Sequence, residues 1–193
     1  MKIIGITGGI GSGKSTVCNI FNILGTPVYQ SDERAKFLMQ NDTILKHQII
    51  HEFGKESYAN DTLNRAHLAT IVFNSKKQTE KINTLVHPVV ARDFLSWYES
   101  QTSNYVLKEA ALMIESGAYK SLNHMIGVSA PIDIRIKRTM KRDAFRTEAE
   151  IRSIIDKQVS EEERIALSDH IIINDGTSLL IPEVIKLHEK FSS

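Results

Sequence analysis

The sequence predicts an α/β fold in which a five-stranded parallel sheet carries helices on both faces. Three observations support this fold. Short apolar segments alternate with helical patterns along the 193 residues. A glycine-rich stretch directly follows the first apolar segment. One long stretch, residues 32–103, contains only helical patterns and no clear strand. Together they indicate one α/β core, formed by residues 1–31 and 104–193, that is interrupted by a helical insertion.

The predicted strands are short and apolar, and the first helix, from Ser15 to Leu24, follows the first of them. Gly25 is a plausible residue just past the end of that helix, and Pro27 lies shortly beyond it. The strands are expected at Lys2–Thr7, Pro27–Tyr29, Tyr105–Lys108, Met125–Ser129 and His170–Asn174.

The run from Gly8 to Thr16 fits G-x-x-x-x-G-K-[ST], the phosphate-binding loop of nucleotide-binding proteins. Glycines let the backbone wrap around a polyphosphate, and the following helix adds its positive N-terminal end. Lys14 is expected to reach the β- and γ-phosphates, and the Ser15 hydroxyl is expected to hold Mg²⁺. The sequence therefore predicts binding of ATP or GTP. The expected nucleotide contacts are Gly9, Gly11, Ser12, Gly13, Lys14, Ser15 and Thr16.

The composition excludes several classes of protein. There are 24 Lys and Arg against 23 Asp and Glu, so the net charge of +1 gives no reason to expect nucleic-acid binding. The single cysteine excludes an internal disulfide and suits a reducing cytoplasm. Cys18 itself is expected to be a small buried apolar residue. No apolar run approaches the roughly 20 residues of a membrane span, and the N-terminus is already a strand. A cytoplasmic monomer or weak homo-oligomer is expected.

The insertion, residues 32–103, contains five helical patterns between the second and third strands. Asn64 is a good N-cap for the pattern that begins at Arg65, and Ser75 is a good N-cap for the pattern that begins at Lys76. An insertion at this place projects at the carboxyl ends of the strands, where α/β sheets bind ligands. It is therefore expected to bind the acceptor substrate, and the alternative is a purely structural insert. The patterns span Asp32–Gln40, Thr43–Phe53, Arg65–Phe73, Lys76–Val86 and Val89–Ser100.

A basic segment at about residues 135–160 is typical of a helical lid. Thr147 is the predicted N-cap of its second helix, with Glu150 at the capping-box position. Arginine forks match phosphate oxygens, so closure of this segment would bring positive charge to the transferring group. This prediction rests mainly on Arg138 and Arg142, and the alternative is a solvated basic face. The basic residues are Arg135, Lys137, Arg138, Lys141, Arg142 and Arg146.

Asp32 is the candidate general base. It follows the apolar run that ends at Tyr29, so it is expected at the carboxyl end of the second strand, close to the phosphate-binding loop. A kinase often uses such a carboxylate to accept the proton of the acceptor hydroxyl. Asp32 could equally serve as the N-cap or a first-turn acid of the next helix. Position alone leaves both roles open.

The chain resembles the dephospho-CoA kinase family along nearly its whole length. The opening from Gly5 to Thr16 matches the start of that family almost letter for letter. The family carries Asp-Ala-Asp after the second strand, where this chain has Gln30-Ser31-Asp32, so Asp32 matches the proposed base and Gln30 replaces the first carboxylate. The other matching segments are Leu63–Leu68, Leu85–Pro88, Arg138, Arg142–Asp143, Gln158 and Ile173–Gly176; in Glu109–Glu115, Ala111 stands where the family commonly has proline.

The resemblance implies a reaction: ATP phosphorylates the ribose 3′-hydroxyl of dephospho-CoA and yields CoA and ADP. It implies Asp32 as the base, Lys14 as a stabiliser of phosphate charge, and Arg138 and Arg142 as arginines that close over the phosphates. The implied acceptor contacts are Asp32, Arg65, His87, Lys108 and Glu115, and the implied adenine-side residues are Asn174 and Gly176.

Two other classes remain as alternatives at this point. The nearest is a kinase for another small acceptor, such as a nucleotide or shikimate, because the phosphate-binding loop does not select the acceptor. A GTP-dependent switch would carry Asn-Lys-x-Asp, which the sequence lacks. A motor-like ATPase would need an apolar strand that ends in a carboxylate, and the strand before Ser129 does not.

Overall fold

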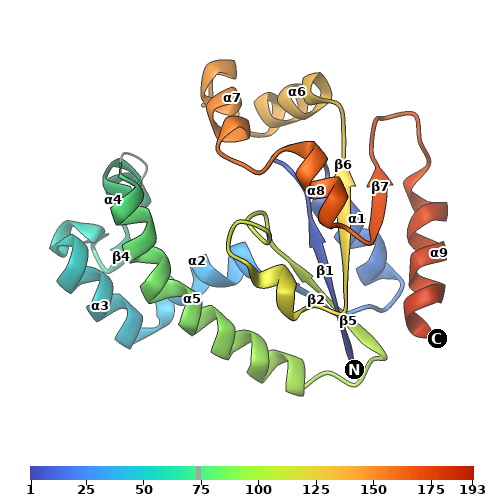
Figure 1. Cartoon of the computed structure of the whole chain (residues 1–193). Coiled ribbons are helices and arrows are strands. Elements are labelled where there is room, and N and C mark those ends of the chain that lie inside the picture. The colour runs from blue at the N-terminus through green and yellow to red at the C-terminus, as the bar shows by residue number, and fades with distance from the viewer. Residues whose placement is uncertain (73–74) are drawn as a thin grey trace. The chain divides into compact units, whose positions relative to one another are not determined.

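The computed structural model describes residues 1–72 and 75–193. The chain divides into two compact units (Figure 1), one of residues 1–30 and 101–193 and the other of residues 31–100. Within the described residues, no helix combines the length and the apolar character needed to cross a membrane.

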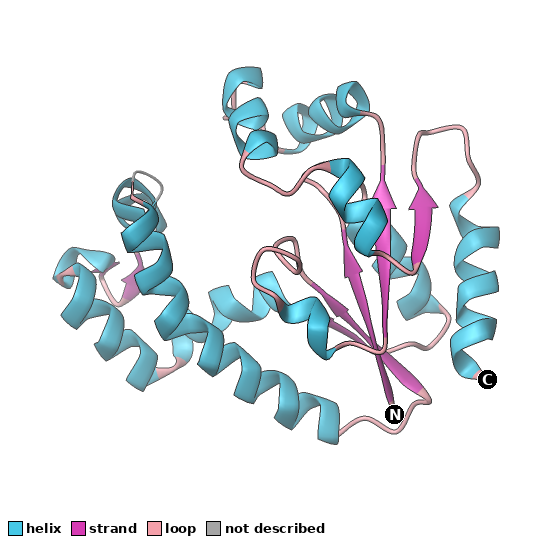
Figure 2. Cartoon of the chain, viewed as in Figure 1, coloured by secondary structure: helices cyan, strands magenta, loops and turns pink. Residues whose placement is uncertain are grey.

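The first unit contains a five-stranded sheet in the order β2-β5-β1-β6-β7, and every neighbouring pair is parallel (Figure 2). Its order places β1 in the centre, so the loop that follows β1 emerges at the middle of the sheet's carboxyl edge. The predicted five-stranded parallel sheet is confirmed. The strands are β1 (Lys2–Thr7), β2 (Val28–Gln30), β5 (Tyr105–Glu109), β6 (His124–Ser129) and β7 (His170–Ile173).

Helices cover both faces of this sheet. The longer elements are α1 (Lys14–Ile23), α6 (Ile132–Arg142), α7 (Glu148–Asp156), α8 (Glu161–Leu167) and α9 (Leu180–Ser192), with a short 3₁₀ turn at Ala118–Ser121. The predicted C-terminal end of α1 and the predicted N-terminal cap of α7 are confirmed. Gly25, with φ of 87°, ends α1 while Thr26 N–H donates to the Phe21 carbonyl, and Thr147 and Glu150 form the predicted capping box of α7.

One face of the sheet carries the main core. Alternate strand side chains, among them Ile4, Ile6 and Ile126, pack against Phe21 of α1 and Phe191 of α9, and all are buried. Cys18 lies in the same cluster, as predicted, and burial raises the pKa of its thiol to about 12. This core anchors α1, and α1 in turn carries the phosphate-binding loop at its N-terminus.

A smaller cluster covers the opposite face. Met113 and Ile114, from the segment after β5, pack with Met125 of β6 and with the half-buried Leu167 of α8. Because both faces of the sheet are covered, the strands are mainly apolar and buried rather than alternating between apolar and polar residues. This burial explains why the sequence pattern indicated a parallel sheet.

Ile126→Ala is expected to lower the free energy of unfolding by about 2–5 kcal/mol, because Ile126 is completely buried in the central core and truncation leaves a cavity. Urea unfolding followed by circular dichroism measures this loss. Ile23→Ala is the matched control, since Ile23 is 82% exposed, and its effect is expected to stay within about 0.5 kcal/mol. Equal effects of the two substitutions would contradict the assigned core.

The second unit is helical. It comprises α2 (Ser31–Asn41), α3 (Thr43–Phe53), a 3₁₀ turn (Lys55–Ser57), β3 (Tyr58–Ala59), β4 (Thr62–Leu63), α4 (Arg65–Val72) and α5 (Lys76–Glu99). Leu45 and Ile49 of α3 pack against Ile82, Val86 and Val89 of α5 in a separate core. The predicted caps Asn64 and Ser75 accept from the N–H groups of His67 and Gln78. The predicted end of the third helix, Phe73, lies outside the described residues.

Two predictions for this unit are wrong. The predicted helices at 76–86 and 89–100 form one helix, α5, which continues through Pro88. Pro88 removes one backbone hydrogen bond, but the apolar stripe through Ile82, Val86 and Val89 continues across it and packs on one core. Helix α2 also begins at Ser31, earlier than predicted.

The expectation of no strand in the insertion is also wrong, because β3 and β4 form a short antiparallel hairpin. Asn60 and Asp61 both have positive φ, which is the geometry of a two-residue type I′ turn. The Gln40 side chain extends the pairing, since it accepts from Leu63 N–H at 2.8 Å and donates to the Asp61 carbonyl at 2.9 Å. Two-residue strands leave no alternating pattern in the sequence.

Candidate phosphate-binding site

The glycine-rich loop joins β1 to α1, as the motif requires. Gly13 stands at the N-cap of α1 in the left-handed region, with φ of 97°, and no side chain caps the helix there. A Cβ at this position would overlap Nδ2 of Asn174, so both the backbone angle and the packing demand glycine. The first turn of α1 therefore presents its amides at the carboxyl edge of the sheet, as an anion-binding site needs.

Lys14 lies within the loop. Its Nζ donates to the Gly8 carbonyl at 2.9 Å and lies 4.0 Å from Oε1 of Glu109. Glu109 is the last residue of β5, is only 8% exposed, and pairs in register with both Ile6 and Gln30. The structure thus adds a carboxylate beside the loop lysine that the sequence reasoning did not select as a site residue. Its signal was present: an acid ends an apolar strand.

Asn174, in the chain just after β7, links three parts of the site. Its Nδ2 donates to the Ser12 carbonyl at 2.8 Å, and its N–H donates to the Ser129 carbonyl at 2.8 Å. Arg138 donates to the backbone and side-chain oxygens of Asn174, at 2.9 and 3.1 Å. The structure therefore joins Arg138, Asn174 and the loop, three of the predicted components. Gly176 follows at φ of 89°, in the turn where Asp175 accepts from Thr177 and Ser178.

Arg142 lies elsewhere on the lid segment, in the last turn of α6. Its guanidinium donates twice to Asp143, at 2.8 and 2.9 Å, and this bidentate pair holds the pKa of the Asp143 carboxyl below its usual range. The described contacts of Arg142 do not include the phosphate-binding loop. Of the two predicted lid arginines, the structure brings only Arg138 to that loop's partners.

Two predicted acceptor contacts follow or belong to β5. Lys108 is half-buried in the strand, and this burial lowers the pKa of its ammonium. Successive side chains of a strand alternate, so Lys108 and Glu109 point to opposite faces of the sheet. Glu115 is exposed, and its Oε1 accepts from the Val159 N–H at 3.0 Å, which ties the segment after β5 to the start of α8.

The remaining predicted residues belong to the helical unit. Asp32 is the second residue of α2, and Ser31 separates it from the end of β2, so it is a first-turn acid rather than an N-cap. Arg65 is the first residue of α4, beyond its cap Asn64, and its side chain is exposed. His87 is exposed on α5, immediately before Pro88.

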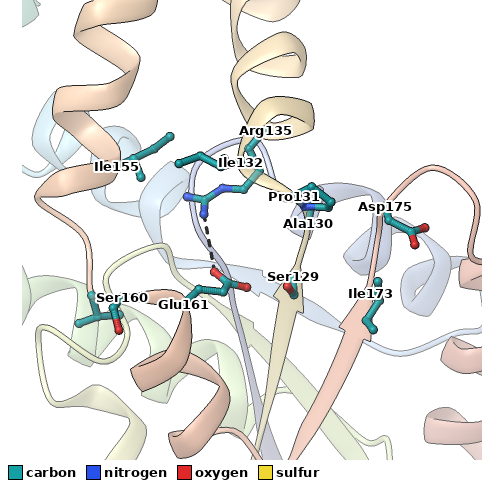
Figure 3. A pocket seen from close by; sticks show the side chains of 11 residues that line it. Ser129, Ala130, Pro131, Ile132, Arg135, Ile155, Ser160, Glu161, Ile173 and Asp175 are labelled. Carbon is teal, nitrogen blue, oxygen red and sulfur yellow. Dashed lines mark ion pairs between the residues drawn. The ribbon is translucent and has the colours of Figure 1, made fainter.

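A pocket of about 500 Å³ lies at the carboxyl ends of β6 and β7 (Figure 3). Its walls are partly apolar, and the ion pair between Arg135 and Glu161, 3.6 Å long, borders it. Arg135 of the predicted lid segment lines this pocket, but none of the residues predicted to contact the nucleotide or the acceptor does. The lining residues are Ser129, Ala130, Pro131, Ile132, Arg135, Ile155, Val159, Ser160, Glu161, Ile173 and Asp175.

Three features define the class of the protein as a P-loop kinase. A phosphate-binding loop follows the central strand of an all-parallel sheet, a lysine lies within that loop, and a segment with arginines follows β6. Comparison with known proteins agrees. A crystal structure of a Thermus thermophilus protein has a TM-score of 0.88 at 28% identity and covers 100% of this chain and 98% of its own. The dephospho-CoA kinase of Campylobacter jejuni has a TM-score of 0.69 at 27% identity, covering 98% and 96%.

The particular family follows from the sequence comparisons. The family model for dephospho-CoA kinase matches residues 2–179. A dephospho-CoA kinase of Bacteroides fragilis is 36% identical over 185 residues, which cover 95% of this chain and 90% of the relative. The chain belongs to the dephospho-CoA kinase family. It is an ATP-dependent phosphotransferase, and the reaction of its family is the final step of coenzyme A biosynthesis. This assignment rules against the GTP switch and the motor ATPase.

Proposed function

We propose that this chain transfers the γ-phosphoryl group of ATP to the ribose 3′-hydroxyl of dephospho-CoA. The observation that carries the proposal is the placement of Lys14 in a phosphate-binding loop, between the Gly8 carbonyl and the Glu109 carboxylate, in a member of this family. When nucleotide binds, the Lys14 ammonium would exchange the Gly8 carbonyl for phosphate oxygens. Its charge would then stabilise the charge that develops on the transferring group.

The residues present fit a magnesium ion that arrives with the nucleotide. Ser15 is exposed in the first turn of α1, and the Glu109 carboxylate ends the neighbouring strand; hydroxyl and carboxylate oxygens are hard ligands that suit Mg²⁺. Ser15 would hold the ion, and the Glu109 carboxylate would be a further oxygen ligand for it. Bound there, Mg²⁺ supplies neutralising charge to the phosphate oxygens.

Asp32 is proposed as the base. In this proposal its carboxylate accepts a hydrogen bond from the ribose 3′-hydroxyl and takes the proton as the oxygen attacks phosphorus. The position of Asp32 in α2 supports the role, because only Ser31 separates it from the carboxyl end of β2 and its side chain is exposed. Arg65, His87, Lys108 and Glu115 are proposed to contact the acceptor.

Arg138 and Arg142 are proposed to act on the nucleotide. Arg138 donates to Asn174, which itself bonds to the loop, and this contact supports a role for Arg138 and the Asn174–Gly176 turn in binding the nucleotide. Arg142 is paired with Asp143 at the exposed end of α6, so contact with a phosphate would exchange one anionic partner for another. We further propose that the chain is cytoplasmic and acts as a monomer or weak homo-oligomer.

The test of the proposed function is acceptor dependence. Purified protein is incubated with Mg-ATP and no acceptor, dephospho-CoA, AMP, adenosine or shikimate, and ADP is quantified by chromatography. We expect ADP release only with dephospho-CoA, accompanied by a product with the mass of CoA. ADP release without any acceptor, or dependence on a different acceptor, would overturn the proposed substrate. Lys14→Ala protein, purified in the same way, controls for contaminating ATPase, because a contaminant would release ADP in both preparations.

A further inference from the structure

The two ends of the lid segment meet at one residue of the phosphate-binding loop, Ile10. Arg135 lies in α6, at the start of the segment, and Gln158 lies after α7, near its end. Both side chains reach Ile10, at the tip of the loop. Neither residue has a part in the phosphoryl transfer proposed above, so their position needs a separate explanation.

Both polar groups of the Ile10 residue are satisfied by these side chains. Arg135 Nε donates to the Ile10 carbonyl at 3.0 Å, and Gln158 Oε1 accepts from the Ile10 N–H at 2.9 Å. Loop backbone normally makes such bonds to its neighbours in sequence or to water. Here the partners lie 125 and 148 residues away along the chain, so the tip of the loop is held by tertiary contacts.

Arg135 is itself held firmly. The residue is 5% exposed, and its Nη1 lies 3.6 Å from Glu161, which also accepts from Arg164 Nη1 at 2.5 Å. Arg164, 2% exposed, donates in turn to the Val159 carbonyl at 3.0 Å. The single carboxylate of Glu161 therefore lies between two buried guanidinium groups, as Figure 3 shows for its pair with Arg135. Such a pair is costly to disturb, because removing one partner leaves a buried charge uncompensated.

Two glycines of the loop allow this close contact, because neither has a side chain. A Cβ on Gly9 would overlap the Arg135 guanidinium, and a Cβ on Gly11 would overlap the Arg135 carbonyl, which already accepts from Thr139 Oγ1 at 2.8 Å. The backbone on either side of Ile10 thus lies directly on the α6 residue. A close approach on both sides fixes the direction of the neighbouring amides, which are the groups that bind phosphate.

We propose that Arg135 and Gln158 are positioning residues that hold the two peptide groups of Ile10 and thereby pre-organise the phosphate-binding loop for nucleotide. The inference rests on the nucleotide site described above and is independent of the acceptor. A loop that is ordered before binding loses less conformational freedom when the nucleotide arrives. Loss of either contact therefore weakens nucleotide binding even though neither side chain touches the phosphates. The two contacts from the ends of the lid segment to Ile10 therefore contribute to the affinity for nucleotide.

The test measures binding of Mg-ATP by calorimetry in the absence of any acceptor. Gln158→Leu removes the acceptor of the Ile10 N–H, and Arg135→Lys retains a positive charge but loses the Nε donor and the planar fork. We expect each to raise the Kd for ATP about fivefold to thirtyfold, the effect of one or two lost hydrogen bonds. Arg152→Met is the matched control, because Arg152 lies on the same segment and pairs with Glu148 on the exposed face of α7.

Two further readouts separate positioning from general stability. Amide hydrogen exchange of Ile10 is expected to speed up in Gln158→Leu while the thermal unfolding midpoint changes little. The double variant is expected to lose less affinity than the sum of the single losses, because both residues act on the backbone of the same loop residue, Ile10. An ATP Kd for Gln158→Leu within twofold of the parent protein, or equal to that of Arg152→Met, would overturn the proposal. If the acceptor test showed that the enzyme uses a substrate other than dephospho-CoA, this proposal would still stand, because ATP binding is measured without any acceptor.

Discussion

Lys14→Ala is expected to lower turnover by at least roughly 10²–10³-fold, which is the cost of removing one electrostatic stabiliser of a developing charge. The Lys14 ammonium is the cation that the structure places inside the loop, 2.9 Å from the Gly8 carbonyl and 4.0 Å from Glu109. Alanine removes this positive charge, so the negative Glu109 carboxylate would lie beside the bound phosphates with no lysine to compensate it. Initial rates of ADP formation, with saturating dephospho-CoA, measure the loss.

The matched control is Lys186→Ala. Lys186 is exposed on α9, so its removal changes the net charge by the same amount and is expected to leave the rate unchanged. Circular dichroism and the unfolding midpoint show whether the Lys14 variant is folded. Near-normal turnover of a folded Lys14→Ala protein would contradict the assignment of the loop.

Asp32→Asn is expected to lower the rate of transfer by roughly 10²–10⁴-fold while the fold stays intact, because the amide cannot accept the proton of the ribose hydroxyl. The structure places Asp32 in the first turn of α2, where a negative charge also interacts favourably with the helix dipole. That structural contribution is only about 0.3–1 kcal/mol, so it is measurable as a small loss of stability. Rates at saturating ATP and dephospho-CoA, together with urea unfolding, separate the two roles.

Glu33→Gln serves as the control for Asp32→Asn. Glu33 is the next residue of the same helix turn and pairs with Lys36 at 2.6 Å on the exposed side of α2. Its substitution removes the same charge from the same helix end, and the rate is expected to stay within twofold. If Asp32→Asn keeps its activity and loses only stability, Asp32 is a helix residue and the base must be sought elsewhere.

Local patterns predicted much of the fold. The strand–loop–helix opening, the α1 end at Gly25 and the capping box at Thr147 and Glu150 are all confirmed. Each depends on residues within a few positions of one another, so the sequence contains the whole cause. The parallel sheet was also predictable, because strands buried on both faces are apolar throughout.

Predictions were less successful where local conformational preferences compete with tertiary packing. Pro88 is a local reason to end a helix, yet α5 continues because its apolar stripe packs on the core of the helical unit. The hairpin of β3 and β4 is stabilised partly by the Gln40 side chain, about twenty positions earlier in the chain. Neither outcome can be read from a short window.

The candidate site shows the same division. Local sequence was enough to identify the phosphate-binding loop, its lysine and the family, because a phosphate-binding loop needs a fixed order of glycines, lysine and hydroxyl over a few residues. Other features of the site depend on tertiary packing: Glu109 lies beside Lys14, Asn174 joins Arg138 to the loop, and Arg135 and Gln158 bind the backbone of Ile10. These contacts join residues about 30 to 160 positions apart, and their distances are set by how the strands and helices pack rather than by any local pattern.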